Sequence, residues 1–221
     1  MSRRALVAWL PALVALAGTG CLGGHLPPLE FYRLAFSDSA RMATPLDGTD
    51  LRVALAPGSM AVAPYLTPGI YADRSIVYRV DDTQYGSYPS REWALPLSTM
   101  LGLVTQDVLR AHPMTAEPAV FDPPSYTSQT YVWRGLVREF EEVDRGSEVF
   151  AAVRLEARVV RASDDSVLWS GSVRMEEPVP EGTMPAIVST LSRVSAAAVS
   201  RLAEEARAAL ARAASAARPR P

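Results

Sequence analysis

The sequence predicts a single α+β domain, in which an antiparallel or mixed β-sheet carries two main helices packed on one of its faces. Three observations support this fold class. Apolar residues alternate with polar ones along two long segments of the second half, the period of half-buried strands. Two further segments, in the middle and at the end of the chain, carry apolar residues every three or four positions, as amphipathic helices do. No internal repeat or second domain is evident.

The first half predicts short strands separated by turns. Residues 31–34 (FYRL) indicate the first strand, and residues 37–50, rich in Ser, Asp, Pro and Gly, indicate a loop. Residues 51–56 (LRVALA) predict a second strand that ends at Pro57-Gly58. Residues 76–80 predict a third strand, and the polar, Tyr-rich residues 81–89 suggest a hairpin turn with a short strand.

The middle helix is expected at about residues 93–110. One face of it carries apolar residues spaced by three or four positions, namely Trp93, Leu97, Leu101, Val104 and Val108. Ser90 is the candidate cap, and Pro96 is tolerated because backbone N–H groups of the first turn have no partner within the helix.

The second half predicts a three-stranded antiparallel meander. Residues 111–128 contain four prolines and are expected to be an irregular crossover loop. Residues 131–142 indicate a long strand, and residues 149–160 alternate apolar and charged side chains. Residues 163–166 (SDDS) predict a turn, after which the alternation resumes over residues 167–175.

A long helix is predicted to end the chain. Gly182-Thr183 offers a cap and Pro185 suits the first turn. The expected inner face comprises Ile187, Leu191, Val194, Ala198, Leu202 and Leu210, and Arg201 and Glu205 are spaced to form an i,i+4 pair outside. From about residue 211 the Ala/Arg-rich end is expected to fray or to pack on a neighbour.

The first residues indicate export and a lipid anchor. Ser2-Arg3-Arg4 precede an apolar run over residues 5–17 and small residues before Cys21, the order of a secretory signal. The run is shorter than the roughly 20 residues that a spanning helix needs, so no permanent transmembrane segment is expected. The sole cysteine directly after this run predicts lipidation of Cys21 with a diacylglyceryl group and an acyl chain such as palmitate. The alternative is plain secretion with a free thiol.

Domain organisation follows from these features. Residues 1–20 form the signal peptide, 21–30 the lipidated tether, 31–211 the folded domain and 212–221 a flexible tail. Removing Arg3 and Arg4 with the leader leaves 20 of the 22 arginines against 24 acidic side chains, a formal net charge of −4. That balance argues against nucleic-acid binding, which needs a basic field. A single cysteine excludes an intramolecular disulfide.

No catalytic or metal-binding constellation can be assembled from the sequence. His25 and His112 are the two histidines, and neither has the neighbours that a zinc site needs. Phosphate-binding glycine loops and nucleophile elbows are absent. Glu139, Glu141 and Glu142 are interpreted as solvated strand residues, and Asp164-Asp165 as turn residues. We therefore expect no enzyme activity, no metal and no cofactor.

Tyrosines are the remaining candidates for function, at positions 65, 71, 78, 85, 88, 126 and 131. The simpler interpretation is that these tyrosines pack in strands and loops. The alternative is that they form a contact surface, because Tyr is enriched at interfaces. Pro64, Tyr65 and Leu66 are the favoured contact segment, since proline lowers the ordering cost of binding. Tyr78 and Trp93 are weaker candidates, and the Trp93 face is more often core than contact.

The order of several short motifs resembles a known family. The motifs are Pro64-Tyr65-Leu66, Asp73-Arg74, residues 76–79 (IVYR) and the residues Trp93, Ala94, Pro96 and Leu97. In this order they resemble the auxiliary lipoproteins of ABC-type transport systems, of the paraquat-inducible protein C type, which work beside MCE-domain lipid transporters.

The resemblance implies a lipid-anchored periplasmic subunit of an MCE/ABC-type lipid transport system. It would dock the MCE-domain protein at the periplasmic face of the outer membrane and support membrane integrity. A phospholipid ligand and a homo-oligomer are further possibilities that the resemblance leaves open. The alternatives are an envelope scaffold or activator lipoprotein and a direct lipid-binding carrier.

Overall fold

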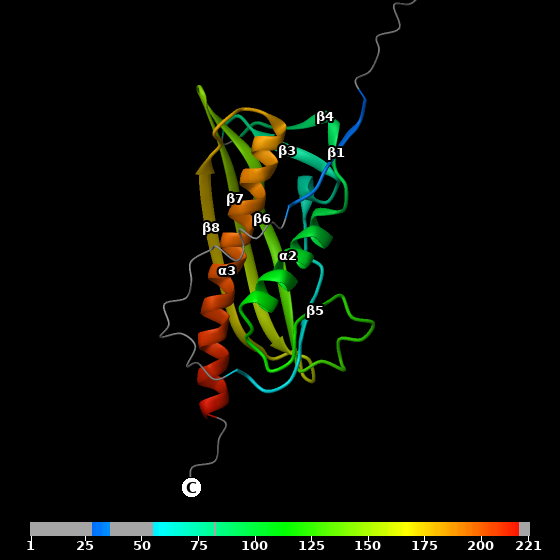
Figure 1. Ribbon diagram of the computed structural model, residues 1–221, viewed down its shortest axis with the longest axis vertical. Helices are drawn as coiled ribbons and strands as arrows, with labels where there is room; N and C mark the ends of the chain where they lie inside the picture. The colour runs from blue at the N-terminus through cyan, green and yellow to red at the C-terminus, as the bar shows by residue number, and fades with distance from the viewer. Residues whose placement is uncertain (1–27, 36–54, 82, 217–221) are drawn as a thin grey trace, which may run out of the picture.

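The computed structural model describes residues 28–35, 55–81 and 83–216, which form an open sheet covered on one face by helices (Figure 1). In these ranges the sheet has eight strands. They are β1 (Glu30–Tyr32), β2 (Met60–Val62), β3 (Ser75–Arg79), β4 (Tyr85–Trp93), β5 (Val120–Phe121), β6 (Tyr131–Arg145), β7 (Glu148–Arg161) and β8 (Val167–Pro178). The helices are the 3-10 helix η2 (Gly69–Tyr71), α2 (Leu97–Ala111) and α3 (Met184–Ala216).

Strand β6 lies at the centre of the sheet. Strand β7 pairs antiparallel with one edge of β6 along its whole length, and β8 pairs antiparallel with β7. On the other edge, β2 and β3 pair parallel with the two ends of β6, and Leu66 forms an isolated bridge with Leu136 between them. The predicted α+β class, the mixed sheet and the three-stranded meander are therefore confirmed.

Both helices lie on the same face of the sheet, which we call the inner face (Figure 1). Helix α3 packs on β7 and β8, and α2 packs beside it. The apolar stripe predicted for the last helix is buried against the sheet, and Arg201 and Glu205 form the predicted pair at 3.2 Å. We call the opposite face the outer face.

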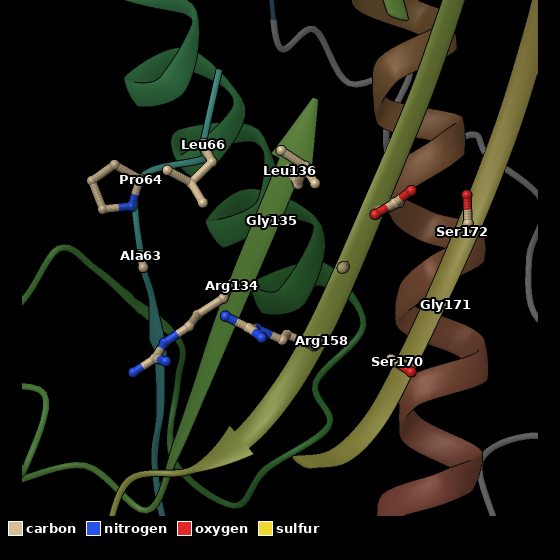
Figure 2. Close-up of a pocket in the computed structure, with 12 residues that line it drawn as sticks. Ala63, Pro64, Leu66, Arg134, Gly135, Leu136, Arg158, Ser170, Gly171 and Ser172 are labelled. Atoms are coloured by element: carbon tan, nitrogen blue, oxygen red, sulfur yellow. The ribbon is translucent and has the colours of Figure 1, made fainter. Parts of the chain in front are cut away.

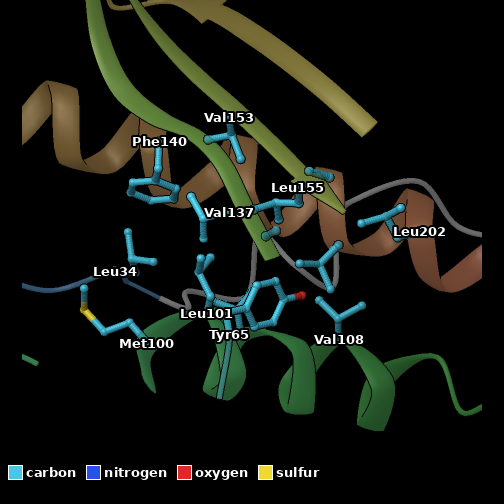
Figure 3. Close-up of a cluster of buried hydrophobic side chains, with 14 of the residues drawn as sticks. Leu34, Tyr65, Met100, Leu101, Val108, Val137, Phe140, Val153, Leu155 and Leu202 are labelled. Carbon is cyan, nitrogen blue, oxygen red and sulfur yellow. The ribbon is translucent and has the colours of Figure 1, made fainter. Parts of the chain in front are cut away.

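Large side chains fill the space between the sheet and the helices (Figure 3). Phe140 and Leu155 on the sheet face Leu101 on α2 and Leu202 on α3, and all four are buried. Trp93 adds an edge-on contact to Phe140, with ring centroids 5.9 Å apart. Alternation along β7 supports this arrangement, because its odd-numbered residues from Ala151 to Val159 face the core.

The predicted start of the middle helix is wrong. Helix α2 begins at Leu97, and Trp93 is the last residue of β4. Ser90 lies within β4, so it does not cap the helix, and the N-cap residue is Pro96. A residue before proline is disfavoured in the helical region, so Leu95 resists continuing a helix back toward Trp93. Trp93 still reaches the same core, which explains why its spacing matched the helical pattern.

Smaller differences concern element boundaries. The first strand spans 30–32 in place of 31–34, and the proline-rich crossover contains the two-residue strand β5. Helix α3 continues to Ala216, so the first residues of the predicted tail are helical. Of the strand predicted at 51–56, only the end is described, and there Ala56 bridges to Thr115. The signal peptide, Cys21 and the loop at 37–50 lie outside the described residues.

We expect replacement of Leu101 by alanine to lower the free energy of unfolding by about 2–5 kcal/mol, because it leaves a cavity in the core. Leu101 is fully buried, whereas Leu95 is 44% exposed, so Leu95→Ala is the matched control and should change stability by less than about 0.5 kcal/mol. Urea denaturation followed by circular dichroism measures both. Equal effects of the two variants would contradict the packing described above.

Candidate functional site

A groove crosses the outer face, on the side of the sheet away from the helices (Figure 2). Its volume is about 610 Å³, within the range of small-molecule sites. Strands β6, β7 and β8 form the floor, and the segment 63–66 forms one rim beside β6. The lining residues are Ala63, Pro64, Leu66, Arg134, Gly135, Leu136, Glu156, Ala157, Arg158, Ser170, Gly171 and Ser172.

Tyr65 anchors the rim from the inside. Its side chain is buried, its hydroxyl lies 2.9 Å from the Thr105 hydroxyl on α2, and Trp133 Nε1–H donates to it at 3.1 Å. Burial raises the pKa of Tyr65 to about 12, so the hydroxyl stays protonated at neutral pH and serves both partners.

Backbone hydrogen bonds hold the same segment against β6. The amide of Ala63 donates to Trp133 O at 3.0 Å, and that of Leu66 to Gly135 O at 2.9 Å. The amide of Val137 in turn donates to Leu66 O at 2.9 Å. With Tyr65 directed inward, its neighbours Pro64 and Leu66 face solvent, and Leu66 is 67% exposed.

Gly135 is required by the close approach of Tyr65. A Cβ atom at this position would lie 2.2 Å from the Tyr65 ring, a distance that no real Cβ contact shows. The glycine in β6 and the tyrosine in the rim therefore form one packing unit, in which the absent side chain makes room for the ring.

Arginines dominate the polar part of the floor. Arg134 on β6 and Arg158 on β7 are partners in register. Glu156 lies in the same groove, but Arg138 binds both of its carboxylate oxygens, at 2.9 and 3.1 Å, and this lowers the pKa of Glu156. The side chains of the floor therefore carry a net positive charge, although the chain as a whole has a formal net charge of −2.

A buried ion pair fixes the loop that follows the rim. Arg79 Nε donates to Glu141 Oε1 at 2.7 Å, and the Tyr71 hydroxyl donates to Glu141 Oε2. Glu141 is fully buried, and burial together with the hydrogen bond to Glu141 raises the pKa of Tyr71. The loop around η2 is thereby tied to β6 through one carboxylate.

The prediction that Glu141 and Glu142 are solvated is wrong. Both are buried, and each contacts side chains from elsewhere in the chain: Arg79 and Tyr71 bind Glu141. Glu142 points to the other face, where Tyr88 donates to it at 2.7 Å, and burial raises the pKa of Glu142. Glu139 lies in an ion pair with Arg174 at 2.7 Å. The burial of these glutamates depends on contacts with residues distant in sequence, so the local sequence pattern could not predict it.

The predicted contact residues are separated by the fold. Pro64 and Leu66 line the groove rim, whereas Tyr65 and Trp93 are core residues whose side chains do not reach the surface. Tyr78 is half-buried on β3, where its ring packs on Tyr88 with centroids 5.2 Å apart, and it does not line the groove. Cys21 lies outside the described residues. The arginines and serines of the floor were missed, although their alternation with apolar residues marked them as facing away from the core.

Other kinds of site receive no support from the described residues. In those ranges no group of three or more His, Cys, Asp or Glu side chains could hold a metal ion. Neither α2 nor the described length of α3 is apolar enough to cross a membrane. His112 forms the C-terminal cap of α2, where its backbone N–H donates to Val108 O, in line with the predicted helix end.

Comparison with known proteins identifies related sequences and folds. The family described as ABC-type transport auxiliary lipoprotein component matches residues 38–216. No curated protein sequence matches the chain. The chain is similar in structure to protein XCC0632 from Xanthomonas campestris, with a TM-score of 0.65 and 19% identity over 81% of this chain and 95% of that one.

Two further solved structures share parts of the architecture. An uncharacterised protein matches with a TM-score of 0.57 and 16% identity, over 80% of this chain and 98% of that one. PelC from Paraburkholderia phytofirmans, crystallised as a dodecamer, matches with a TM-score of 0.45 and 15% identity, over 71% and 91%. At these identities the first two likenesses show the fold alone, and the third carries no argument.

Replacement of Tyr65 by phenylalanine should lower the free energy of unfolding by about 1–3 kcal/mol, because the buried Trp133 N–H loses its acceptor. The matched control is Tyr126→Phe, since that hydroxyl donates to Asp122 at the surface. Thermal unfolding monitored by circular dichroism compares the two variants. A Tyr65→Phe protein as stable as Tyr126→Phe would contradict the internal anchor.

Replacement of Glu141 by alanine should lower the free energy of unfolding by about 3–5 kcal/mol, because it removes the buried carboxylate to which Arg79 Nε and the Tyr71 hydroxyl both donate. Glu205→Ala removes a carboxylate from an exposed helical pair and should cost about 0.5 kcal/mol or less. Chemical denaturation at neutral pH provides both values. A loss at position 141 no larger than that at 205 would show that the buried pair does not hold the loop.

Proposed function

The chain belongs to the family of ABC-type transport auxiliary lipoprotein components, and we propose that it docks an MCE-domain periplasmic protein of a lipid transporter at the outer membrane. In this role the chain secures one end of a conduit between the two membranes and so supports membrane integrity. The ATPase and the permease are other chains in this proposal.

One observation carries the docking proposal. The rim residues Pro64 and Leu66 are exposed, although their segment is fixed by the Tyr65 anchor and by backbone bonds to β6. An exposed apolar side chain on a rigid segment binds a partner without a large ordering cost. Ile70, in the loop that follows, is also an exposed apolar side chain, at 45%.

The proposed lipid anchor limits where docking takes place. Eight residues lie between Cys21 and the start of β1 at Glu30. A fully extended chain spans at most about 3.3–3.6 Å per residue, so the start of β1 stays within roughly 30 Å of the lipid. A partner that contacts the rim must therefore itself approach the membrane surface that holds Cys21, for which we propose the periplasmic face of the outer membrane.

We propose no catalytic step for this chain. The polar groups of the groove are arginines, serines and a glutamate that is already paired with Arg138. None of these serines has a histidine, lysine or free carboxylate of the groove lining beside it to act as a general base. Binding, and not bond making, is the chemistry that this set of side chains supports.

The test is an affinity pull-down of the full-length, C-terminally tagged protein extracted from membranes, followed by mass spectrometry of its partners and of its N-terminal peptide. We expect an acylated Cys21 and an MCE-domain protein among the partners. Leu66→Ser should reduce capture of that partner about tenfold, the loss typical of one apolar anchor of an interface. Val80→Ser is the matched control, because Val80 is also exposed but lies at the β3–β4 turn.

Other outcomes separate the alternatives. Capture of an envelope synthase in place of an MCE-domain protein would replace the docking role by that of a scaffold or activator. An unmodified Cys21 would overturn the proposed anchor. Equal loss of the partner in Leu66→Ser and Val80→Ser would refute the rim as the docking surface.

A further inference from the structure

The outer face contains two arginines in register with no carboxylate in their row. Arg134 on β6 is opposite Arg158 on β7, and Arg158 is opposite Ser170 on β8. Like charges directly opposite each other on neighbouring strands destabilise a sheet. Figure 2 shows both arginine side chains extending in the same direction, toward the strand segment that carries Ala63 and Pro64.

Other arginines on this face are neutralised by carboxylates. Arg154 and Arg174 are also opposite each other, but Glu139 stands in the same row and lies 2.7 Å from Arg174. Arg138 is held by Glu156. A row that places two arginines together without such a carboxylate is therefore the exception on this face.

The two groove arginines differ in how they are held: Arg134 lies in an exposed ion pair, a weak kind of contact with which a ligand can compete, whereas the Arg158 side chain has no such partner among the described residues. Arg134 has one exposed partner, Asp165 in the β7–β8 turn, at 2.9 Å. The Arg158 side chain makes no hydrogen bond or ion pair with any residue in the described part of the chain. Guanidinium groups present several N–H donors in a planar fork that matches the oxygens of phosphate.

Hydroxyl groups complete the polar end of the groove. Ser170 and Ser172 on β8 line it and are exposed, and their hydroxyl groups make no hydrogen bond within the described ranges. Gly171 between them also lines the groove. Ser170 is opposite Arg158 in register and Ser172 is opposite Glu156, so the groove adds hydroxyl donors on β8 to the two guanidinium groups.

Apolar side chains border these donors. Leu66 and Pro64 form the rim, and Leu136 on β6 lies beside them (Figure 2). A ligand that satisfies both parts of the groove carries an anionic head and an apolar body. An extended peptide fits less well, because β6, β7 and β8 pair with one another along the floor and offer no strand edge there.

We propose that this groove binds a phospholipid head group, with its phosphate on Arg134 and Arg158 and its glycerol and first acyl carbons against Leu66 and Leu136. The proposal goes beyond partner docking and does not depend on it. Leu66 takes part in both, whereas the arginines of the floor belong to the lipid site alone.

The test is native mass spectrometry of the full-length protein in a nonionic detergent, titrated with phosphatidylglycerol. Diacylglycerol with the same acyl chains is the probe without phosphate, and inorganic phosphate is added as a competitor without acyl chains. We expect phosphatidylglycerol to bind at least about tenfold more tightly than diacylglycerol, the difference that charge-assisted hydrogen bonds supply. Inorganic phosphate should compete only weakly.

Matched variants locate the site. Arg158→Gln should weaken phosphatidylglycerol binding about tenfold, since one charged donor is lost. Arg154→Gln removes the same charge from the same face of β7 outside the groove, and its binding should stay within about twofold of the parent protein, as expected of a distant and independent site. Both side chains are exposed, and an unchanged thermal unfolding midpoint checks that each variant folds.

Three results would overturn the proposal. They are equal binding by Arg158→Gln and Arg154→Gln, diacylglycerol binding as tight as that of phosphatidylglycerol, and inorganic phosphate competing as strongly as the lipid itself. The first result would refute the proposed location of the site, the second the contact with the phosphate, and the third the contribution of the apolar residues. Because purified protein and lipid suffice here, failure of this test leaves the pull-down result unaffected, and the reverse also holds.

Discussion

Hydrogen bonding along both edges of β6 is the constraint on which the rest of the structure depends. One edge is occupied by β7 throughout, and the other is shared by β2, the Leu66 bridge and β3. The chain from Met60 to Arg79 must therefore follow β6 from one end to the other. This path places the rim beside the groove and brings Arg79 and Tyr71 to Glu141.

The two faces of the sheet have different roles, one in stability and the other in binding. The inner face buries apolar side chains under α2 and α3, and this burial is the main driving force for folding. Within the described residues the outer face has no helix over the groove, and it carries charged side chains that lie mostly in exposed ion pairs. Such pairs contribute little stability each, so a row that lacks them is tolerated. The outer face can therefore carry binding residues at small cost.

The groove combines a rigid rim with a cationic floor because neighbouring residues point to opposite faces. Tyr65 faces α2 while Pro64 and Leu66 face outward, and Gly135 admits the Tyr65 ring while Arg134 and Leu136 face the groove. Because of this alternation, inward-facing residues fix the segment to the core while their neighbours face the groove. Rim and floor differ in chemistry: the floor is cationic and is assigned the phosphate, and the rim is apolar and is assigned the protein partner and the first acyl carbons of the lipid.

The sequence by itself determined the fold class, the meander, the stripe of the last helix and the family, because each depends on local periodicity or on the order of short motifs. It also singled out residues 64–66. The sequence did not predict the start of α2, because the apolar spacing did not show that β4 continues to Trp93. The burial of Glu141 and Glu142 depended on strands and loops far away in the chain. The groove depended on them as well, since Arg134 and Arg158 meet only through strand register. Periodicity tells which way a side chain faces, whereas only the tertiary structure decides what lies opposite it.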